Sequence, residues 1–280
     1  MMDKLTKMFV FYMIITFGVW WSIAWAYFLF NSIFTSYLGV LTLFSPLMLV
    51  VLYLPSMTAL IVYYRLKKWD GIKGILYKFV PEKKDLFWFP VLLVLFVIFS
   101  LAMRFGCLAL GVPVPQISYT PGQILLIVAG NFIKETGLLG GVIGWMGFVL
   151  PFFQSKLKDP IHAAILTGLL FGLWVLPGYF IASFHTQTSY SLYVIQLISF
   201  ILFQSYIFNV TKGNLLIYFF SFGLISSGSH INLYYFNNPI QVLQIIFFAL
   251  AALTINIIFR KLKINYSVQR FPEFIMISLE

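Results

Sequence analysis

Apolar runs of about twenty residues or more recur along the whole of this 280-residue chain. A run of that length is typical of a helix that crosses a lipid bilayer, because a helix satisfies its own backbone hydrogen bonds. Only 9% of the residues are charged, whereas soluble domains carry about a quarter charged residues. The sequence therefore excludes a soluble domain and predicts an all-α polytopic protein of the cell membrane.

We predict about eight transmembrane helices within a single domain over residues 1–280. Their approximate bounds are 8–33, 37–64, 86–112, 122–152, 161–182, 190–210, 214–232 and 239–260. No small-residue cleavage site follows the first apolar run, so we expect this run to be retained as a span.

The cationic residues are distributed unevenly among the predicted connections. Sixteen of the 18 Lys and Arg residues precede the first span or follow every second span. Because short cytoplasmic loops carry an excess of Lys and Arg, we expect both termini in the cytoplasm. The net charge of +10 then reflects orientation in the membrane, and we expect no binding of nucleic acid.

The longest polar connection covers residues 66–85. Its apolar residues recur at helical spacing with lysines between them, which predicts a short helix lying in the cytoplasmic interface. These apolar residues are Trp69, Ile72, Ile75, Leu76 and Phe79. We favour a lipid-anchoring role for this loop over a docking surface for a partner.

One apolar stretch, GGVIGWMGFVLP at residues 140–151, combines glycines, a tryptophan and a terminal proline. It resembles the first motif of the CPBP intramembrane proteases, also called the CAAX protease or Abi family, whose usual pattern is close to G-E-E-x-G-W-R-G-[YF]-L-x-P. Gly141 and Val142 stand where the family has two glutamates, and Met146 stands where it has an arginine. The other motif positions fit, namely Gly140, Gly144, Trp145, Gly147, Phe148, Leu150 and Pro151.

Two further segments are similar to the same family. The stretch GLWVLPGYF at residues 172–180 is similar to the family's L-W-H-L-P, with Val175 in place of the histidine. The stretch TKGNLLIYFFSFGLISSGSH at residues 211–230 opens like T-x-G-[SN]-L-L. There the alignment puts Phe222 at a second histidine and Ser226 at an asparagine. The resemblance covers residues 120–232, which we take as a CPBP/Abi-like core.

The resemblance implies the fold of an intramembrane protease without its chemistry. In the family, a glutamate and a histidine serve as base and as water or metal ligand, and the second histidine and the asparagine complete the site. The degenerate positions here offer at most the Ser226 hydroxyl, which is too little to activate water or hold a metal. We therefore expect no catalytic residues, no metal and no cofactor, and we lean towards a pseudoprotease rather than an enzyme.

Depth along the predicted spans is consistent with this alignment. At 1.5 Å per residue, Gly141, Val175, Phe222 and Ser226 fall at overlapping depths. We therefore expect the four positions to line one cavity.

Three ionisable residues lie inside the predicted spans, namely Arg104, Lys134 and Glu135. Arg104 and Glu135 share a depth in the outer half of the membrane with His230. Intramembrane charges usually face one another or a wet cavity. We favour a structural Arg104–Glu135 pair over a polar site for a ligand or partner.

Three functions remain open from the sequence. We favour a catalytically inactive scaffold, regulator or bacteriocin-immunity-type partner of another membrane protein or hydrophobic peptide. The second is an active CAAX-type metalloprotease with a displaced site that uses Glu135 and His230. The third is a small transporter or lipid-binding protein.

Overall fold

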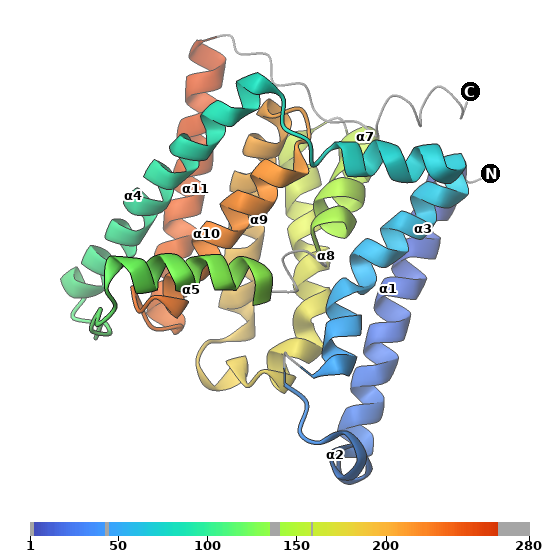
Figure 1. The fold of residues 1–280 in the computed structure, drawn as a ribbon, viewed down its shortest axis with the longest axis horizontal. Helices are drawn as coiled ribbons and strands as arrows, with labels where there is room; N and C mark the ends of the chain where they lie inside the picture. Colours follow the sequence, from blue (N-terminus) through green and yellow to red (C-terminus); the bar gives the residue numbers. More distant parts are fainter. Residues whose placement is uncertain (1–2, 43–44, 135–140, 158, 263–280) are drawn as a thin grey trace.

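The computed structural model describes residues 3–42, 45–134, 141–157 and 159–262. The regular elements of these residues are all helices, and no strand occurs among them. The longest helices lie side by side as a bundle, as Figure 1 shows. This arrangement confirms the all-helical class that the apolar runs predict.

The elements follow one another along the chain in a simple order. They are α1 Lys4–Leu29, α2 Asn31–Leu38, α3 Pro46–Tyr77, η1 Lys83–Phe87, α4 Trp88–Ala109, α5 Pro121–Lys134, η2 Val142–Val149, α7 Leu150–Leu157, α8 Pro160–Ile181, η3 Phe184–Thr186, α9 Tyr190–Val210, α10 Leu215–His230 and α11 Asn238–Lys261.

Polar residues fix the starts of several helices. Asp3, Asp159, Asn214 and Asn237 precede α1, α8, α10 and α11, and each side chain accepts a hydrogen bond from a backbone N–H of the first turn. Such caps satisfy donors that have no partner inside the helix. The apolar runs therefore begin as helices at defined residues.

Six helices of the described part are long and apolar enough to cross a membrane, as expected of a multi-pass membrane protein. They are α1, α3, η1 with α4, α8, α9 and α11. The apolar helices α5, η2 with α7, and α10 are shorter. The count of eight spans is therefore not confirmed.

The predicted span 122–152 differs most from the structure. Its described residues form α5 on one side of residues 135–140 and η2 with α7 on the other. In Figure 1, α5 lies across the bundle, transverse to α10. A depth counted along one continuous helix therefore does not apply to Gly141, which directly precedes η2.

The third helix, α3, changes direction near its end. Lys67 and Lys68 have non-helical backbone angles, and Lys68 has a φ of 52°. After this break the last turns of α3 run across the end of the bundle (Figure 1). A short helix over part of the 66–85 loop thus agrees with the helical spacing of its apolar residues.

Two clusters of buried apolar side chains form the core. The first, which we call the α1-side core, joins residues of α1, α3, η2, α7 and α8. The second, the α4-side core, joins residues of α4, α9, α10 and α11. Helices α9 and α10 contribute to both clusters, so they form the centre of the fold.

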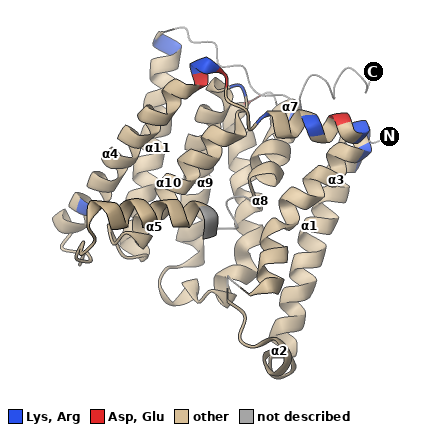
Figure 2. Ribbon diagram, viewed as in Figure 1, with Lys and Arg blue, Asp and Glu red and all other residues tan. Residues whose placement is uncertain are grey.

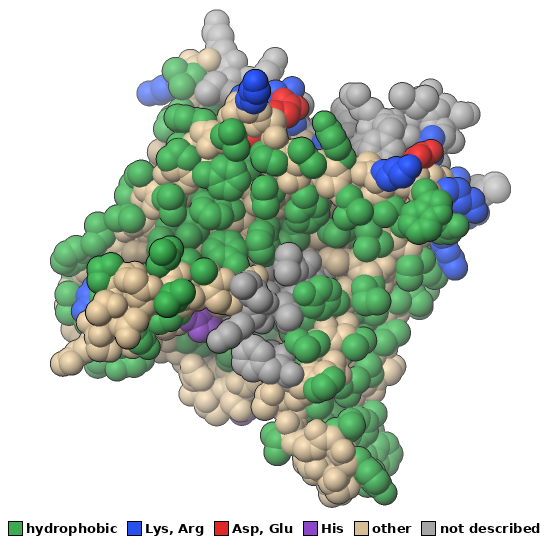
Figure 3. Space-filling view, in the orientation of Figure 1, with side chains coloured by type: hydrophobic (Ala, Val, Ile, Leu, Met, Phe, Trp, Pro, Cys, Tyr) green, Lys and Arg blue, Asp and Glu red, His purple; other side chains and the backbone are tan. Residues whose placement is uncertain are grey.

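Charge and apolar surface are separated on the molecule. Figure 2 shows Lys and Arg gathered mainly at the end where α1 begins and α11 ends. Figure 3 shows hydrophobic side chains over much of the flank of the bundle. An apolar flank with charges at one end is the distribution expected of a protein embedded in a bilayer.

Candidate functional site

The first motif segment forms an unusual helix in the core. Residues Val142–Val149 form the π-helix η2, and all eight residues are buried. Its end is marked by the backbone N–H of Leu150, which donates to the carbonyl of Trp145 five residues earlier. π-Helices are rare and occur frequently at functional sites. Sequence periodicity does not indicate this geometry.

The motif glycines of η2 allow neighbouring helices to approach. A β-carbon at Gly144 would lie 2.6 Å from the Cβ of Pro55 in α3 and 2.8 Å from its carbonyl oxygen. The carbonyl of Gly147 accepts a hydrogen bond from the hydroxyl of Tyr63, also in α3. These two positions therefore join η2 to α3 at close range.

The two motif tryptophans pack against each other. The ring centroids of Trp145 in η2 and Trp174 in α8 lie 5.9 Å apart, with Phe171 5.1 Å from Trp145. Trp20 of α1 donates from its Nε1 to the carbonyl of Trp174 at 2.8 Å. By contrast, the buried Nε1 of Trp145 has no hydrogen-bond partner in the described part of the chain. Ring packing of Trp145 thus joins η2 to α8, whereas a hydrogen bond from Trp20 joins α1 to α8.

The degenerate motif positions largely share one apolar environment. Val142 and Met146 are 2% and 0% exposed and belong to the α1-side core. Val175 and Phe222 are partly buried and pack against the same core. Gly141 precedes η2, and a β-carbon there would lie 3.3 Å from the Cδ1 of Trp145. Apolar side chains therefore fill this region.

Ser226 has a different environment. It lies one turn beyond Phe222 on α10, where its hydroxyl accepts a hydrogen bond from Nδ2 of Asn131 in α5 at 3.2 Å. The expected cavity lined by Gly141, Val175, Phe222 and Ser226 stays a prediction. Phe222 and Val175 share a packed core, whereas Ser226 belongs to the contact between α5 and α10.

Asn131 is the polar residue of this contact that sequence reasoning missed. It is 6% exposed, and its amide also donates to the hydroxyl of Ser227 at 2.8 Å. Next to it, the ring of Phe132 lies 2.3 Å from the position of a β-carbon at Gly223. A lone asparagine within an apolar run was the signal available, since amides in such helices tend to bond across helices.

Other buried amides join the central helices. Gln154 of α7 donates to the Oδ1 of Asn209 in α9 at 3.0 Å, and Gln204 of α9 donates to the hydroxyl of Ser221 in α10 at 2.8 Å. Both glutamines are fully buried. These two contacts are neutral amide and hydroxyl pairs, which orient helices and supply no general base at neutral pH.

The start of the stretch at residues 211–230, which resembles the family's T-x-G-[SN]-L-L, has a structural role. Asn214 accepts from the backbone N–H of Ile217 and so caps α10, and its Nδ2 lies 3.3 Å from the carbonyl oxygen of Val80. The preceding Lys212 and Gly213 have φ values of 53° and 77°. This segment therefore forms a tight turn that ties α10 to the segment between α3 and η1.

The structure describes the side chains of two of the four residues of the predicted polar site, Arg104 and His230. Glu135 lies outside the described residues, and the side chain of Lys134 is also not described. The guanidinium of Arg104 donates to the carbonyl of Pro115 at 3.2 Å. His230 is exposed at the last residue of α10. The pairing of Arg104 with Glu135 stays a prediction.

Potential metal ligands do not gather among the described residues, where no group of three or more His, Cys, Asp and Glu residues occurs. Cys107 is a buried free thiol in the α4-side core.

No family model matches the chain, and no curated protein matches it.

Proposed function

We propose that this protein is a catalytically inactive membrane protein, similar in its core to the CPBP intramembrane proteases, that acts through binding. In this proposal it serves as a scaffold, regulator or immunity-type partner of another membrane protein or hydrophobic peptide. The termini and the lysine-rich end face the cytoplasm, as the excess of cationic residues at that end favours.

The observation that carries the proposal is the burial of Val142 and Met146. A protease of this family would place charged groups at these positions, and a charge inside a membrane protein needs a partner or water. Val142 and Met146 instead belong to the α1-side core, against which Val175 and Phe222 also pack. Peptide hydrolysis requires a base to activate water and a group to stabilise the oxyanion, and apolar side chains at these positions supply neither.

The residues that match the family motif also support the proposal, because their contacts are structural. Gly144 and Gly147 hold η2 against α3, while Trp145 packs on Trp174. These contacts need no catalytic group, so they remain useful in a chain without reactive groups. A fold kept for its shape is suited to holding a second membrane component.

Purification from native membranes in mild detergent tests this function. We expect a membrane protein or hydrophobic peptide to co-purify in a fixed stoichiometry and at its full encoded length, as measured by mass spectrometry. A partner that is shortened in a time-dependent manner would support the displaced-site protease instead. Solute or lipid movement by the protein alone in liposomes would support the transporter or lipid-binding alternative.

A further inference from the structure

Three lysines gather near Glu82 and Asp85 at the cation-rich end of the molecule. Lys84 lies 2.5 Å from Glu82, and the ammonium of Lys78 donates to the carbonyl of Lys212 at 2.9 Å. The hydrogen bond from Lys84 lowers the pKa of Glu82, and the charges of Lys212 and Lys78 lower it further. The carboxylate of Asp85, which accepts from the backbone N–H of Glu82 at 2.9 Å, adds a second negative charge beside Lys84. Three lysines and two carboxylates thus leave a net charge of +1 at this cluster.

The backbone holds these lysines in place. The amide of Leu215 donates to the carbonyl of Lys78 at 2.8 Å, and the side chain of Asn214 donates to the carbonyl of Val80 at 3.3 Å. The turn between α9 and α10 is therefore fixed to the segment between α3 and η1. Because these segments are already held in place, less conformational entropy is lost when a ligand binds.

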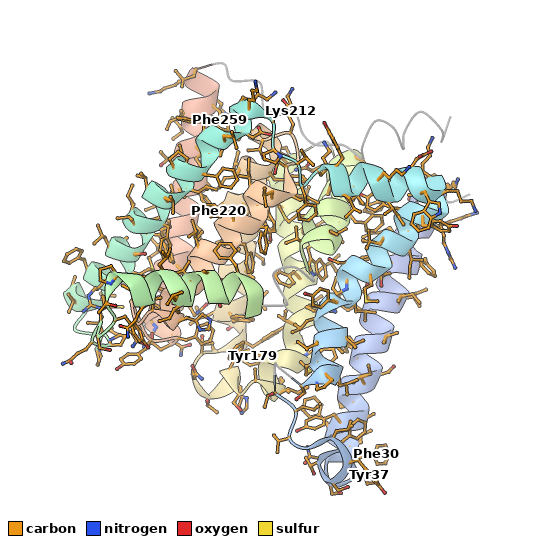
Figure 4. The ribbon with its side chains drawn as sticks, viewed as in Figure 1. Phe30, Tyr37, Tyr179, Lys212, Phe220 and Phe259 are labelled. Atoms are coloured by element: carbon orange, nitrogen blue, oxygen red, sulfur yellow. The ribbon has the colours of Figure 1, made fainter. Side chains whose placement is uncertain are left out.

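Exposed apolar side chains flank the lysine cluster. Tyr77 and Phe87 are 70% and 69% exposed, and Val80 and Leu86 are also exposed. Figure 4 shows Lys212 at one end of the bundle. A positive cluster beside exposed aromatic and aliphatic groups matches the boundary between lipid headgroups and acyl chains.

We propose that Lys78, Lys84 and Lys212 together bind the phosphate of an anionic phospholipid in the leaflet that this end of the protein faces. Ammonium groups bind phosphate as point charges. The net positive charge around Glu82 attracts the negatively charged phosphate. The neighbouring apolar side chains favour a lipid over free phosphate, because they contact the acyl chains of the bound molecule. This inference does not depend on whether the protein has a partner or an activity.

Lipid binding by the full-length protein in nanodiscs tests the proposal. Fluorescent phosphatidylglycerol is titrated into phosphatidylcholine nanodiscs, and energy transfer from the protein reports binding. The site variant carries Lys78→Gln, Lys84→Gln and Lys212→Gln. The control variant carries Lys4→Gln, Lys7→Gln and Lys73→Gln, which removes the same charge from exposed positions in the first turns of α1 and the last turns of α3.

We expect the affinity of the site variant for phosphatidylglycerol to fall by roughly tenfold to a hundredfold, and that of the control by less than about threefold. Equal losses in both variants would overturn the proposal, because they would indicate a diffuse electrostatic effect. Complete competition by inorganic phosphate at the same concentration as the lipid would also overturn it. If the triple variant fails to fold, the double variant Lys84→Gln with Lys212→Gln, which keeps Lys78, should still lose about fivefold or more.

Discussion

Gly144 of η2 lies against Pro55 of α3 so closely that a β-carbon on Gly144 would approach backbone and side-chain atoms of Pro55 to 2.6–2.8 Å. Backbone atoms cannot move aside as a flexible side chain can. The contact therefore fixes the separation between the motif helix and α3, and it requires glycine at position 144.

Gly144→Ala is expected to destabilise the protein by about 1–3 kcal/mol, because overpacking forces the two helices apart. Gly18 provides the control, since a β-carbon there meets no atom within 4 Å. Gly18→Ala should be neutral or stabilising, as alanine has the higher helix propensity. Thermal unfolding in detergent compares the two. A Gly144→Ala protein as stable as Gly18→Ala would show that the close approach is not needed.

The two buried tryptophans Trp20 and Trp145 differ in the hydrogen bonding of the indole N–H, which mutation can test. Both are 2% exposed, but only Trp20 donates from its indole to a carbonyl, that of Trp174. We expect Trp20→Phe to cost about 1 kcal/mol more than Trp145→Phe, the net value of a typical hydrogen bond. Equal losses of thermal stability would argue that the hydrogen bond from Trp20 adds nothing to the contact between α1 and α8.

Asn131 connects α5 to α10 through the hydroxyls of Ser226 and Ser227. Asn131→Ala and Ser227→Ala should each weaken this contact, and the double variant should lose less than the sum of the two. Interhelical hydrogen bonds in membrane proteins show coupling of about 0.6 kcal/mol, reaching roughly 1.7 kcal/mol. Reversible unfolding of the four proteins measures this coupling. Strictly additive losses would mean that Phe132 on Gly223, rather than the amide, holds α5.

The contact between the Asp3 carboxylate and Lys156 should make the thermal stability of the protein depend on pH. Its carboxylate accepts from Lys156 and from the backbone N–H of Thr6. The Lys156 hydrogen bond is the main cause that lowers the pKa of Asp3 from 3.8 to about 2. A lowered folded-state pKa stabilises the protein above the unfolded value, and this contribution disappears as the pH falls from about 4 to about 2.

Asp3→Asn should therefore be less stable than the wild type above about pH 4, by at most about 1 kcal/mol because the pair is exposed, and equally stable near pH 2. The amide oxygen of asparagine can still cap α1. Thermal unfolding across this pH range tests the pair. A constant difference between the two proteins would assign the effect to capping instead.

The sequence predicted the long spans well where apolar runs end at clear signals. The predicted spans 161–182 and 190–210 match α8 and α9 to within one residue at each end. Asp159 and Pro160 mark the start of α8. Such local signals act through the backbone of neighbouring residues, so a single sequence is enough to recognise them.

The remaining differences arise from contacts that are distant in sequence. Composition alone did not separate α5 from η2, because both segments are apolar. The predicted span 37–64 was shifted from α3, which begins at Pro46 and bends at Lys67 and Lys68. The packing of Gly144 on Pro55 and of Asn131 on Ser227 depends on which helices become neighbours. Periodicity and charge do not carry that information.

We propose that this chain keeps the packing frame of an intramembrane protease while the reactive groups are replaced. Incubation of the purified protein in liposomes with a prenylated CAAX-type peptide, with and without added zinc, tests it most directly by mass spectrometry of the peptide. We predict an intact peptide, indistinguishable from that in protein-free liposomes. Chelator-sensitive cleavage that is lost in a Glu135→Gln variant would contradict the claim.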